Sequence, residues 1–328
     1  MDWQQRSLGI GSVLIVAAVI LRLLSTGALE PLAAALEEPK TAALLVYLET
    51  GRVVHPTLPP QTLPATEPTS PTEPPPAETE PEEVYCFSPS DAALVDVQYY
   101  ASYRPDLQAM VTQPLVWNLN AAQPAVLILH SHATESYLPN GCYQESSPYR
   151  TLDTGYNMVS IGAYLTQLLE AGGIRVIHDT ALHDYPSYNA SYAASRKAAQ
   201  EKLAQYPQLM LIIDLHRDGV DGTNQPDTSA TVHGQESAQL MMVVGTRQHG
   251  WESNMALAVK LTAVLEKLHP GVTRPISFRK QQFNQDLSPG ALLIEVGAAG
   301  NTHQEALRAT EALAEGILTL AKGANCGL

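Results

Sequence analysis

The 328-residue sequence contains few cysteines and few basic residues. Its three cysteines, Cys86, Cys142 and Cys326, form no C-x-x-C pair, which argues against both a zinc ribbon and a disulfide scaffold. Only 19 Lys and Arg residues stand against 33 Asp and Glu residues, giving a formal charge of −14, and no Lys/Arg-rich run occurs. Because basic contacts to phosphate supply most nucleic-acid affinity, the sequence argues against a nucleic-acid-binding protein.

The motifs of two common hydrolase classes are also missing. No G-x-S-x-G elbow surrounds any serine, which disfavours a serine hydrolase. Cys142 has no base partner in a recognisable motif, which disfavours a cysteine nucleophile.

The first 83 residues predict a membrane attachment and a spacer. Residues 7–21 carry no charge, and the apolar character continues to Leu29, so residues 1–30 are predicted to form a short cytoplasmic end and a transmembrane anchor. Arg6 before this stretch and the acidic residues after it place the remainder outside the cytoplasm. A cleaved signal peptide, cut near the small residues 25–28, is the alternative. Residues 31–55 form a membrane-proximal segment, and the Pro/Thr/Glu-rich residues 56–83 predict an extended linker.

Residues 84–328 predict one α/β domain. Unbroken apolar runs are typical of strands buried on both faces of a largely parallel sheet, and stretches with apolar residues three and four apart predict helices between them. The expected strands are 125–129, 174–177, 209–213, 240–244 and 291–294, and the expected helices are 157–171, 190–205, 253–268 and 303–322. Alternating strands and helices indicate a layered domain, a sheet flanked by helices.

Three of the apolar runs end in residues that can bind a metal or move a proton. His132 and Glu135 follow the first run, His216 follows the run at 209–213, and Glu295 follows the last. Ligands bind beyond the carboxyl ends of strands in such sheets, and catalytic zinc takes three His or carboxylate ligands. We therefore expect His132, Glu135 and His216 to bind Zn²⁺ and Glu295 to act as general base. Arg217 is expected to stabilise the developing oxyanion.

Neighbouring residues leave alternatives open. Asp153 competes with Glu135 as the third ligand. His130 is expected to pack against or orient the ligands, and a ligand role is its alternative. Asp214 is expected to orient the imidazole of His216 through its other nitrogen, with a solvated or capping role as the alternative. The pairs His178–Asp179 and His183–Asp184 are interpreted as structural.

The chain from about 123 to 321 resembles the stage II sporulation protein P family of endospore-forming Firmicutes. The matching stretches, in the family's order, are LILHSHATESYLP, NMVSIGAYLTQLLEAGGIRVIHD, HDYPSYNASYAASR, LIIDLHRD, FNQDLSPGALLIEVG and NTHQEA. The resemblance implies a zinc-dependent N-acetylmuramoyl-L-alanine amidase with an amidase-3-like fold, with endopeptidase action on stem-peptide cross-links also credited to the family. It further implies the membrane proteins stage II sporulation D and M as partners during forespore engulfment.

The resemblance also implies roles for individual residues. His132 and His216 match the two zinc histidines of the amidase class, and Glu295 matches its catalytic glutamate. The carboxylate ligand is placed nearer Asp153 in ordinary amidases, whereas Glu135 belongs to the H-x-x-E-S-Y stretch of the sporulation family. Asn284, Gln285 and Asp286 are expected at the cleft rim, contacting glycan or peptide, or else to form a purely structural turn.

These features together predict a membrane-anchored zinc hydrolase. It would cut the amide between N-acetylmuramic acid and L-alanine in peptidoglycan, in the space between the mother-cell and forespore membranes. A carboxypeptidase-like metallopeptidase acting on stem peptides is one alternative. A non-catalytic wall-binding scaffold is another, although a pure binding protein has no need of a base such as Glu295.

Overall fold

The computed structural model describes residues 86–115, 118–119, 122–219 and 228–323. The predicted anchor, membrane-proximal segment and linker therefore lie outside the described residues. Within the described part, no helix has the length and apolar character needed to cross a membrane.

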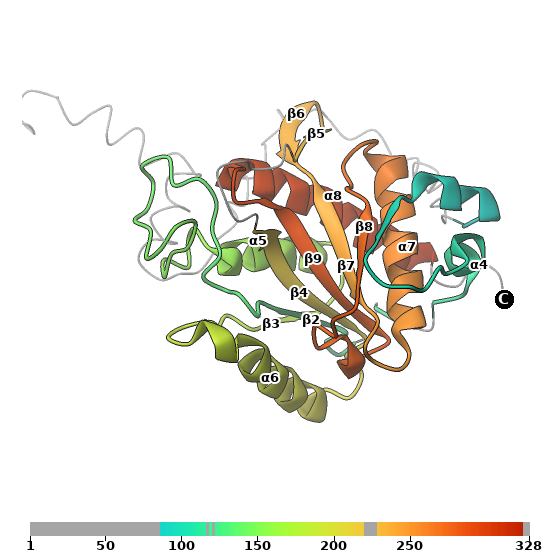
Figure 1. Ribbon diagram of the computed structural model, residues 1–328, viewed down its shortest axis with the longest axis horizontal. Coiled ribbons are helices and arrows are strands. Elements are labelled where there is room, and N and C mark those ends of the chain that lie inside the picture. Colours follow the sequence, from blue (N-terminus) through green and yellow to red (C-terminus); the bar gives the residue numbers. More distant parts are fainter. Residues whose placement is uncertain (1–85, 116–117, 120–121, 220–227, 324–328) are drawn as a thin grey trace, which may run out of the picture. The chain divides into compact units, whose positions relative to one another are not determined.

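A seven-stranded sheet forms the centre of the domain (Figure 1). Its order is β1-β8-β7-β9-β4-β2-β3, and its described neighbours pair in parallel except β7 with β9. β2, β4 and β9 therefore end at the same edge. The strands are β1 (Val97–Tyr99), β2 (Val126–Leu129), β3 (Val176–His178), β4 (Leu211–Asp218), β7 (Leu240–Gly245), β8 (Ile276–Arg279) and β9 (Gly290–Ala298).

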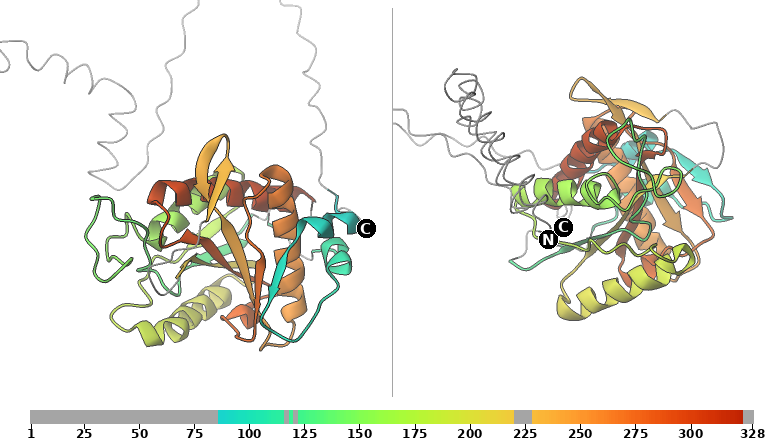
Figure 2. Two further views of the ribbon diagram at one scale, coloured as in Figure 1. Left: turned by 45° about the horizontal axis from the view of Figure 1, so that its top comes forward. Right: turned by 90° about the vertical axis from the view of Figure 1, so that its left-hand side faces the viewer.

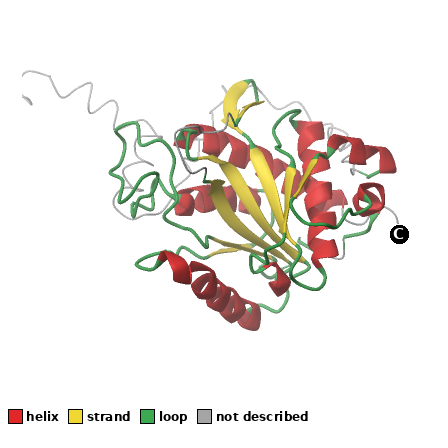
Figure 3. Ribbon diagram, viewed as in Figure 1, coloured by secondary structure: helices red, strands yellow, loops and turns green. Residues whose placement is uncertain are grey.

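Helices cover both faces of this sheet (Figures 2 and 3). α5 (Met158–Ala171), α7 (Trp251–Leu268) and α8 (His303–Gly323) pack on one face around the largest hydrophobic cluster. α6 (Ser191–Gln205) covers the opposite face, where Ala199 packs with Leu127 and Leu129 of β2. Burial on both faces explains the unbroken apolar runs of β2, β4, β7 and β9. The shorter elements are η1 (Pro89–Leu94), α4 (Leu107–Thr112), η2 (Tyr188–Ala190), η3 (Gln285–Leu287) and the hairpin of β5 (Ser229–Val232) and β6 (Gln235–Ala238).

The predicted α/β architecture, with a largely parallel sheet flanked by helices, is confirmed. Each of the four predicted helices is present within two residues of its expected start, and Gly173 after α5 has φ +87°, the left-handed conformation expected of a helix-ending glycine. The prediction missed β1, β8 and the β5–β6 hairpin. These short strands read VQY, ISFR, SATV and QESA, and their polar residues interrupt any apolar run. β1 and α4 come from residues 84–120, which the sequence left unassigned.

α5 approaches β2 and β3 closely because residue 162 is glycine. A Cβ atom at Gly162 would lie 2.5 Å from Nε2 of His178 and 2.6 Å from Nε2 of His130. These distances are far below van der Waals contact; the imidazole of His130 is fully buried and that of His178 is half-buried. The glycine therefore makes the space in which the two histidines meet.

We expect the Gly162→Ala protein to be less stable than the wild type by about 1–3 kcal/mol, the usual cost of overpacking. The better helix propensity of alanine, worth about 1 kcal/mol, offsets only part of this. Urea unfolding followed by circular dichroism measures the change. Gln167→Ala, on the exposed side of the same helix, is the matched control and should leave the midpoint nearly unchanged. Equal midpoints for Gly162→Ala and the wild type would show that α5 can move away from the histidines.

Candidate functional site

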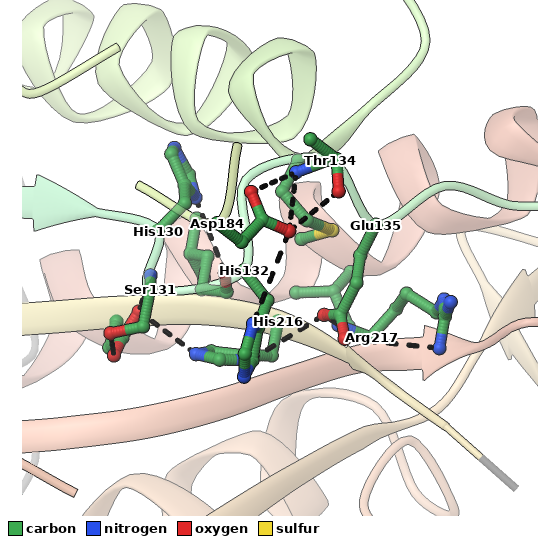
Figure 4. A network of polar contacts seen from close by, with 12 residues as sticks. His130, Ser131, His132, Thr134, Glu135, Asp184, His216 and Arg217 are labelled. Atoms are coloured by element: carbon green, nitrogen blue, oxygen red, sulfur yellow. Dashed lines mark hydrogen bonds and ion pairs between the residues drawn. The ribbon is translucent and has the colours of Figure 1, made fainter. Parts of the chain in front are cut away.

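His132, Glu135 and His216 meet at the carboxyl edge of the sheet (Figure 4). His132 lies in the turn after β2, and His216 lies near the end of β4. Glu295 of β9 pairs in register with His216 on the adjacent strand. The rings of His132 and His216 stand nearly perpendicular, with their centroids 5.3 Å apart. Residues far apart in the chain thus converge because their strands are parallel and adjacent.

His216 lies between two carboxylates. Its Nε2 is 3.0 Å from Oδ1 of Asp214, and its Nδ1 is 3.5 Å from Oε2 of Glu135. Burial disfavours a charged imidazole, but the carboxylates of Asp214 and Glu135 outweigh it and raise the pKa of His216 well above its usual value. The surroundings of His216 therefore favour positive charge, as a proton or as a metal ion.

Glu135, and not Asp153, faces this histidine. Glu135 is buried, and its Oε1 accepts a hydrogen bond of 3.2 Å from Nη2 of Arg150. Burial alone would raise the pKa of Glu135, but its contact with His216 and the charge of Arg217 lower it to about 2. Asp153 is exposed, and its Oδ1 accepts the backbone N–H of Gly155 at 2.9 Å. The geometry favours Glu135 as the third ligand.

Asp184 is a buried part of the site that the sequence analysis left as structural. Its carboxylate accepts hydrogen bonds from the backbone N–H and the hydroxyl of Thr134, and from Nη1 of Arg150 at 2.9 Å. Its Oδ2 also lies 4.0 Å from Nδ1 of His132. Asp184 thus fixes the turn that carries His132. Asp184 lies in the connection after β3, at the same edge of the sheet as His132, and this position in the sequence could have pointed to it as a site residue.

Arg217 has a different environment from the one expected of an oxyanion donor. Its Nε donates to the carbonyl of Ser136 at 2.9 Å, and its Nη2 donates to the carbonyl of Tyr149 at 2.9 Å. Its Nη1 lies 4.0 Å from Oε1 of Glu135. Most of the guanidinium is therefore used to hold the segment that carries Glu135.

Glu295 faces a polar pocket with one carboxylate oxygen buried. Its Oε2 has no hydrogen-bond partner among the described residues. Burial raises the pKa of Glu295 to about 8; His216 opposes this rise, and the negative charge of Glu135 adds to it. A carboxyl group with such a pKa can exchange a proton in the neutral range, as a general acid or base requires.

Aromatic side chains form one wall of the pocket. The ring of Tyr188 stacks on His132 with centroids 4.4 Å apart and planes 12° apart, and Tyr192 contacts the same imidazole edge-on at 5.5 Å. Neither tyrosine was predicted from the sequence, although their four-residue spacing is that of neighbours on one helical face. The full lining is His132, Glu135, Tyr188, Tyr192, His216, Arg217, Asp218, Gly219, Val243, Arg279, Phe283, Leu293 and Glu295.

The predicted rim residues lie beside this pocket and do not line it. Gln285 is buried, and its side chain accepts from the N–H of Gly245 and donates to the carbonyl of Val243. Asn284 donates to the carbonyl of Tyr192, and Asp286 forms an ion pair of 2.6 Å with Arg196. The expectation that Gln285 contacts substrate is wrong, because both ends of its amide are bonded to the backbone of β7. From this loop, Phe283 reaches the pocket.

His130 lies behind His132 and His216. It is fully buried, its Nδ1 is 3.3 Å from the carbonyl of Leu215, and its Nε2 is 2.8 Å from Nε2 of His178. Burial and the neighbouring imidazole lower the pKa of His130 to about 3, and burial lowers that of His178 to about 4. Both rings are therefore neutral in the folded protein at neutral pH.

This pair predicts that the protein loses stability as the pH falls below about 6.5, the pKa of an unfolded histidine. Below that value the unfolded chain takes up protons that the folded rings cannot bind until about pH 4 or below, so acid favours unfolding. We expect the free energy of unfolding of His178→Gln to fall by about 1 kcal/mol less than that of the wild type between pH 7 and pH 5. Urea unfolding at each pH measures both free energies. The difference between variant and wild type removes the contribution of the other groups. Parallel curves for the two proteins would contradict a neutral His178.

The fold and the site define an α/β protein that assembles a buried polar site, with two histidines and two carboxylates, at the carboxyl ends of parallel strands. A family model described as stage II sporulation protein P matches residues 65–318. The chain belongs to this family.

The comparisons also identify a curated relative. The stage II sporulation protein P of Bacillus subtilis (strain 168) is 33% identical over 201 residues, which is 58% of this chain and 49% of that protein. The chain therefore spans about half the length of the curated relative it matches.

Solved structures with some likeness to this chain include two amidases. One is the N-acetylmuramoyl-L-alanine amidase AmiC2 of Nostoc punctiforme, with 15% identity and a TM-score of 0.37 over 60% of this chain and 97% of that one. The other is the N-acetylmuramoyl-L-alanine amidase of Clostridium difficile 630, with 16% identity and a TM-score of 0.37 over 60% and 94%. A structural similarity of this extent does not show that this chain has the activity of either amidase.

Proposed function

We propose that the chain is a zinc-dependent peptidoglycan hydrolase of sporulation that cuts the amide between N-acetylmuramic acid and L-alanine. The observation that carries the proposal is the convergence of His132, Glu135 and His216 with Glu295 on one pocket. Membership of the stage II sporulation protein P family supports peptidoglycan as the substrate. Cleavage of stem-peptide cross-links belongs to the same proposal as a second activity.

The residues present fit a zinc ion. His132 and His216 supply imidazole nitrogen and Glu135 supplies carboxylate oxygen, the donor set of catalytic zinc. Nδ1 of His132 is buried without a hydrogen-bond partner among the described residues, and the carboxylates beside His216 favour a cation. Asp214, at 3.0 Å from Nε2 of His216, is placed to orient this imidazole, as carboxylates do behind metal-bound histidines.

The residues of the site have separate roles in the proposed hydrolysis. A zinc ion bound by His132, Glu135 and His216 would supply a Lewis acid that polarises the scissile carbonyl and acidifies water. Glu295 accepts the proton of the attacking water and delivers it to the nitrogen of L-alanine as the amide bond breaks. Arg150 and Arg217 hold Glu135 in place through the contacts described above.

The pocket walls suit a large amphipathic substrate. Tyr188 is 52% exposed; its ring stacks on His132 and has its centroid 4.8 Å from the guanidinium carbon of Arg150, so a sugar or a peptide chain can pack against its exposed part. Arg279 lines the same pocket and supplies a cation that the sequence analysis missed. We assign to these residues the positioning of the glycan–peptide junction.

Location and partners form part of the proposal. The anchor predicted within residues 1–30 would hold the domain outside the cytoplasm, between the mother-cell and forespore membranes. Stage II sporulation proteins D and M are the proposed partners, from the family resemblance alone.

Product analysis tests the activity and separates the alternatives. The full chain is incubated with purified peptidoglycan, with and without a zinc chelator, and the products are identified by mass spectrometry. We expect free stem peptides that begin at L-alanine, lost on chelation and restored by zinc. Shortened stems with the lactyl amide intact would overturn the amidase assignment in favour of a carboxypeptidase-like enzyme. Binding to the wall without any product, in the presence of both proposed partners, would favour the scaffold.

A further inference from the structure

A second group of metal-binding side chains lies outside the pocket. Nε2 of His233 is 2.8 Å from Oε1 of Glu315, and Nε2 of His269 is 2.7 Å from Oε2 of the same carboxylate. The potential ligand atoms of the three residues all lie within 4.8 Å of one another. None of the three lines the pocket described above. This His233–His269–Glu315 cluster has no part in the chemistry proposed for Glu295.

Three separate elements bring the cluster together. His233 forms the turn of the β5–β6 hairpin with Gly234, and both have positive φ, +51° and +75°, as a tight two-residue turn requires. His269 directly follows α7, and its backbone N–H donates to the carbonyl of Leu265 at 2.8 Å. Glu315 projects from α8, and the hairpin lies beside that helix (Figure 2).

The backbone around the cluster is held by close packing. A Cβ atom at Gly316, next to Glu315, would lie 2.9 Å from a methyl group of Leu265 and 3.1 Å from one of Leu261. Only a glycine lets α8 approach α7 this closely at that point. His269 is itself buried, at 8% exposure. Two of the three side chains therefore sit on a rigid support, which lowers the entropic cost of binding a metal.

Two imidazoles and a carboxylate are one of the donor sets that bind zinc in proteins, with the fourth position taken by water. Without a metal, the two Nε2 atoms each need a proton to bond Glu315. In each neutral imidazole this proton can move through solvent to Nδ1, which leaves Nε2 free to bind a zinc ion, and the carboxylate then balances half of the charge of the ion. We propose that His233, His269 and Glu315 form a second zinc site, which ties the β5–β6 hairpin to α7 and α8 and stabilises the fold.

Zinc stoichiometry and thermal unfolding test this proposal on the full chain. The starting protein is the variant His132→Ala/His216→Ala, stripped of metal, so that the proposed catalytic site cannot contribute. We expect this protein to bind one equivalent of Zn²⁺ in calorimetric titration and to melt several degrees higher with zinc. Adding Glu315→Gln or His233→Ala should abolish both effects. His233 is exposed, so its replacement removes a ligand without opening the core. His249→Ala, at another exposed position, is the matched control.

The outcomes separate this site from the catalytic one. Two zinc equivalents in the wild type, falling to one with Glu315→Gln, would support both sites. One equivalent that is lost with Glu315→Gln and kept in His132→Ala/His216→Ala would support the second site and contradict the catalytic zinc. A starting variant that is folded by circular dichroism and binds no zinc, or that binds it equally well after Glu315→Gln and after His233→Ala, would overturn the second site and leave the proposed function standing. If the starting variant does not fold, the comparison of the wild type with Glu315→Gln decides, and equal zinc stoichiometry in these two proteins would overturn the second site.

Discussion

The Glu295→Gln protein should lose peptidoglycan hydrolysis by about 10²–10⁴-fold, the usual contribution of a general acid or base, and keep its zinc. Glutamine has nearly the same shape as glutamate but cannot take a proton from water and return it to the leaving amine. Burial raises the pKa of Glu295 to about 8 in the metal-free protein, and the positive charge of a bound zinc ion would lower it toward the range in which the carboxylate accepts a proton at neutral pH. Product release from purified peptidoglycan and the zinc content of the same preparation are the two measurements.

Glu252→Gln, in the exposed first turn of α7, is the matched control and should behave as the wild type. Urea unfolding shows whether Glu295→Gln is folded. Undiminished product release by a folded, zinc-loaded Glu295→Gln protein would remove Glu295 from the mechanism and direct attention to Asp218, another carboxylate that lines the pocket.

The His216→Ala protein should lose both activity and the zinc that depends on His132 and Glu135. It should also be less stable in the absence of metal, by about 3–5 kcal/mol, because two buried carboxylates lose the imidazole that lies between them. These are the carboxylates of Asp214 and Glu135, which flank His216 at 3.0 and 3.5 Å. Zinc content by mass spectrometry and urea unfolding of the metal-free proteins test the two effects.

Two further variants separate the metal from the fold. Asp214→Asn keeps the imidazole and changes only the group behind it, so zinc affinity should fall by about 10–100-fold and the protein should retain some activity at saturating zinc. His249→Ala, exposed and remote in sequence, should retain zinc, stability and activity. Full zinc binding by His216→Ala at the catalytic site would contradict the ligand assignment, whatever its activity.

The main elements of the fold could be predicted because they depend on local patterns. The apolar runs of β2, β4, β7 and β9 and the helical spacing in α5, α6, α7 and α8 are visible in short windows of sequence. The antiparallel pairing of β7 with β9 was not predictable in this way. Strand direction depends on how the intervening chain crosses the sheet, and a buried run has the same appearance in either direction.

The residues at the strand ends of the site were predictable for a related reason. Parallel neighbouring strands end at one edge, so His132, His216 and Glu295 meet wherever β2, β4 and β9 are adjacent. Their chemistry could then be read from the residue types. The choice between Glu135 and Asp153 could not, because it depends on the conformation of the turn after β2.

The sequence by itself therefore determined the alternation of strands and helices, the strand-end histidines and glutamate, and the family. Only the tertiary structure decided which side chains surround them. Asp184 behind His132, Tyr188 over its ring, the inward turn of Gln285 and the His233–His269–Glu315 cluster all join segments that are distant in sequence. Such contacts depend on loop conformation and on how closely helices pack. Here Gly162 and Gly316 permit that close packing, and a short window of sequence does not show which element each glycine will pack against.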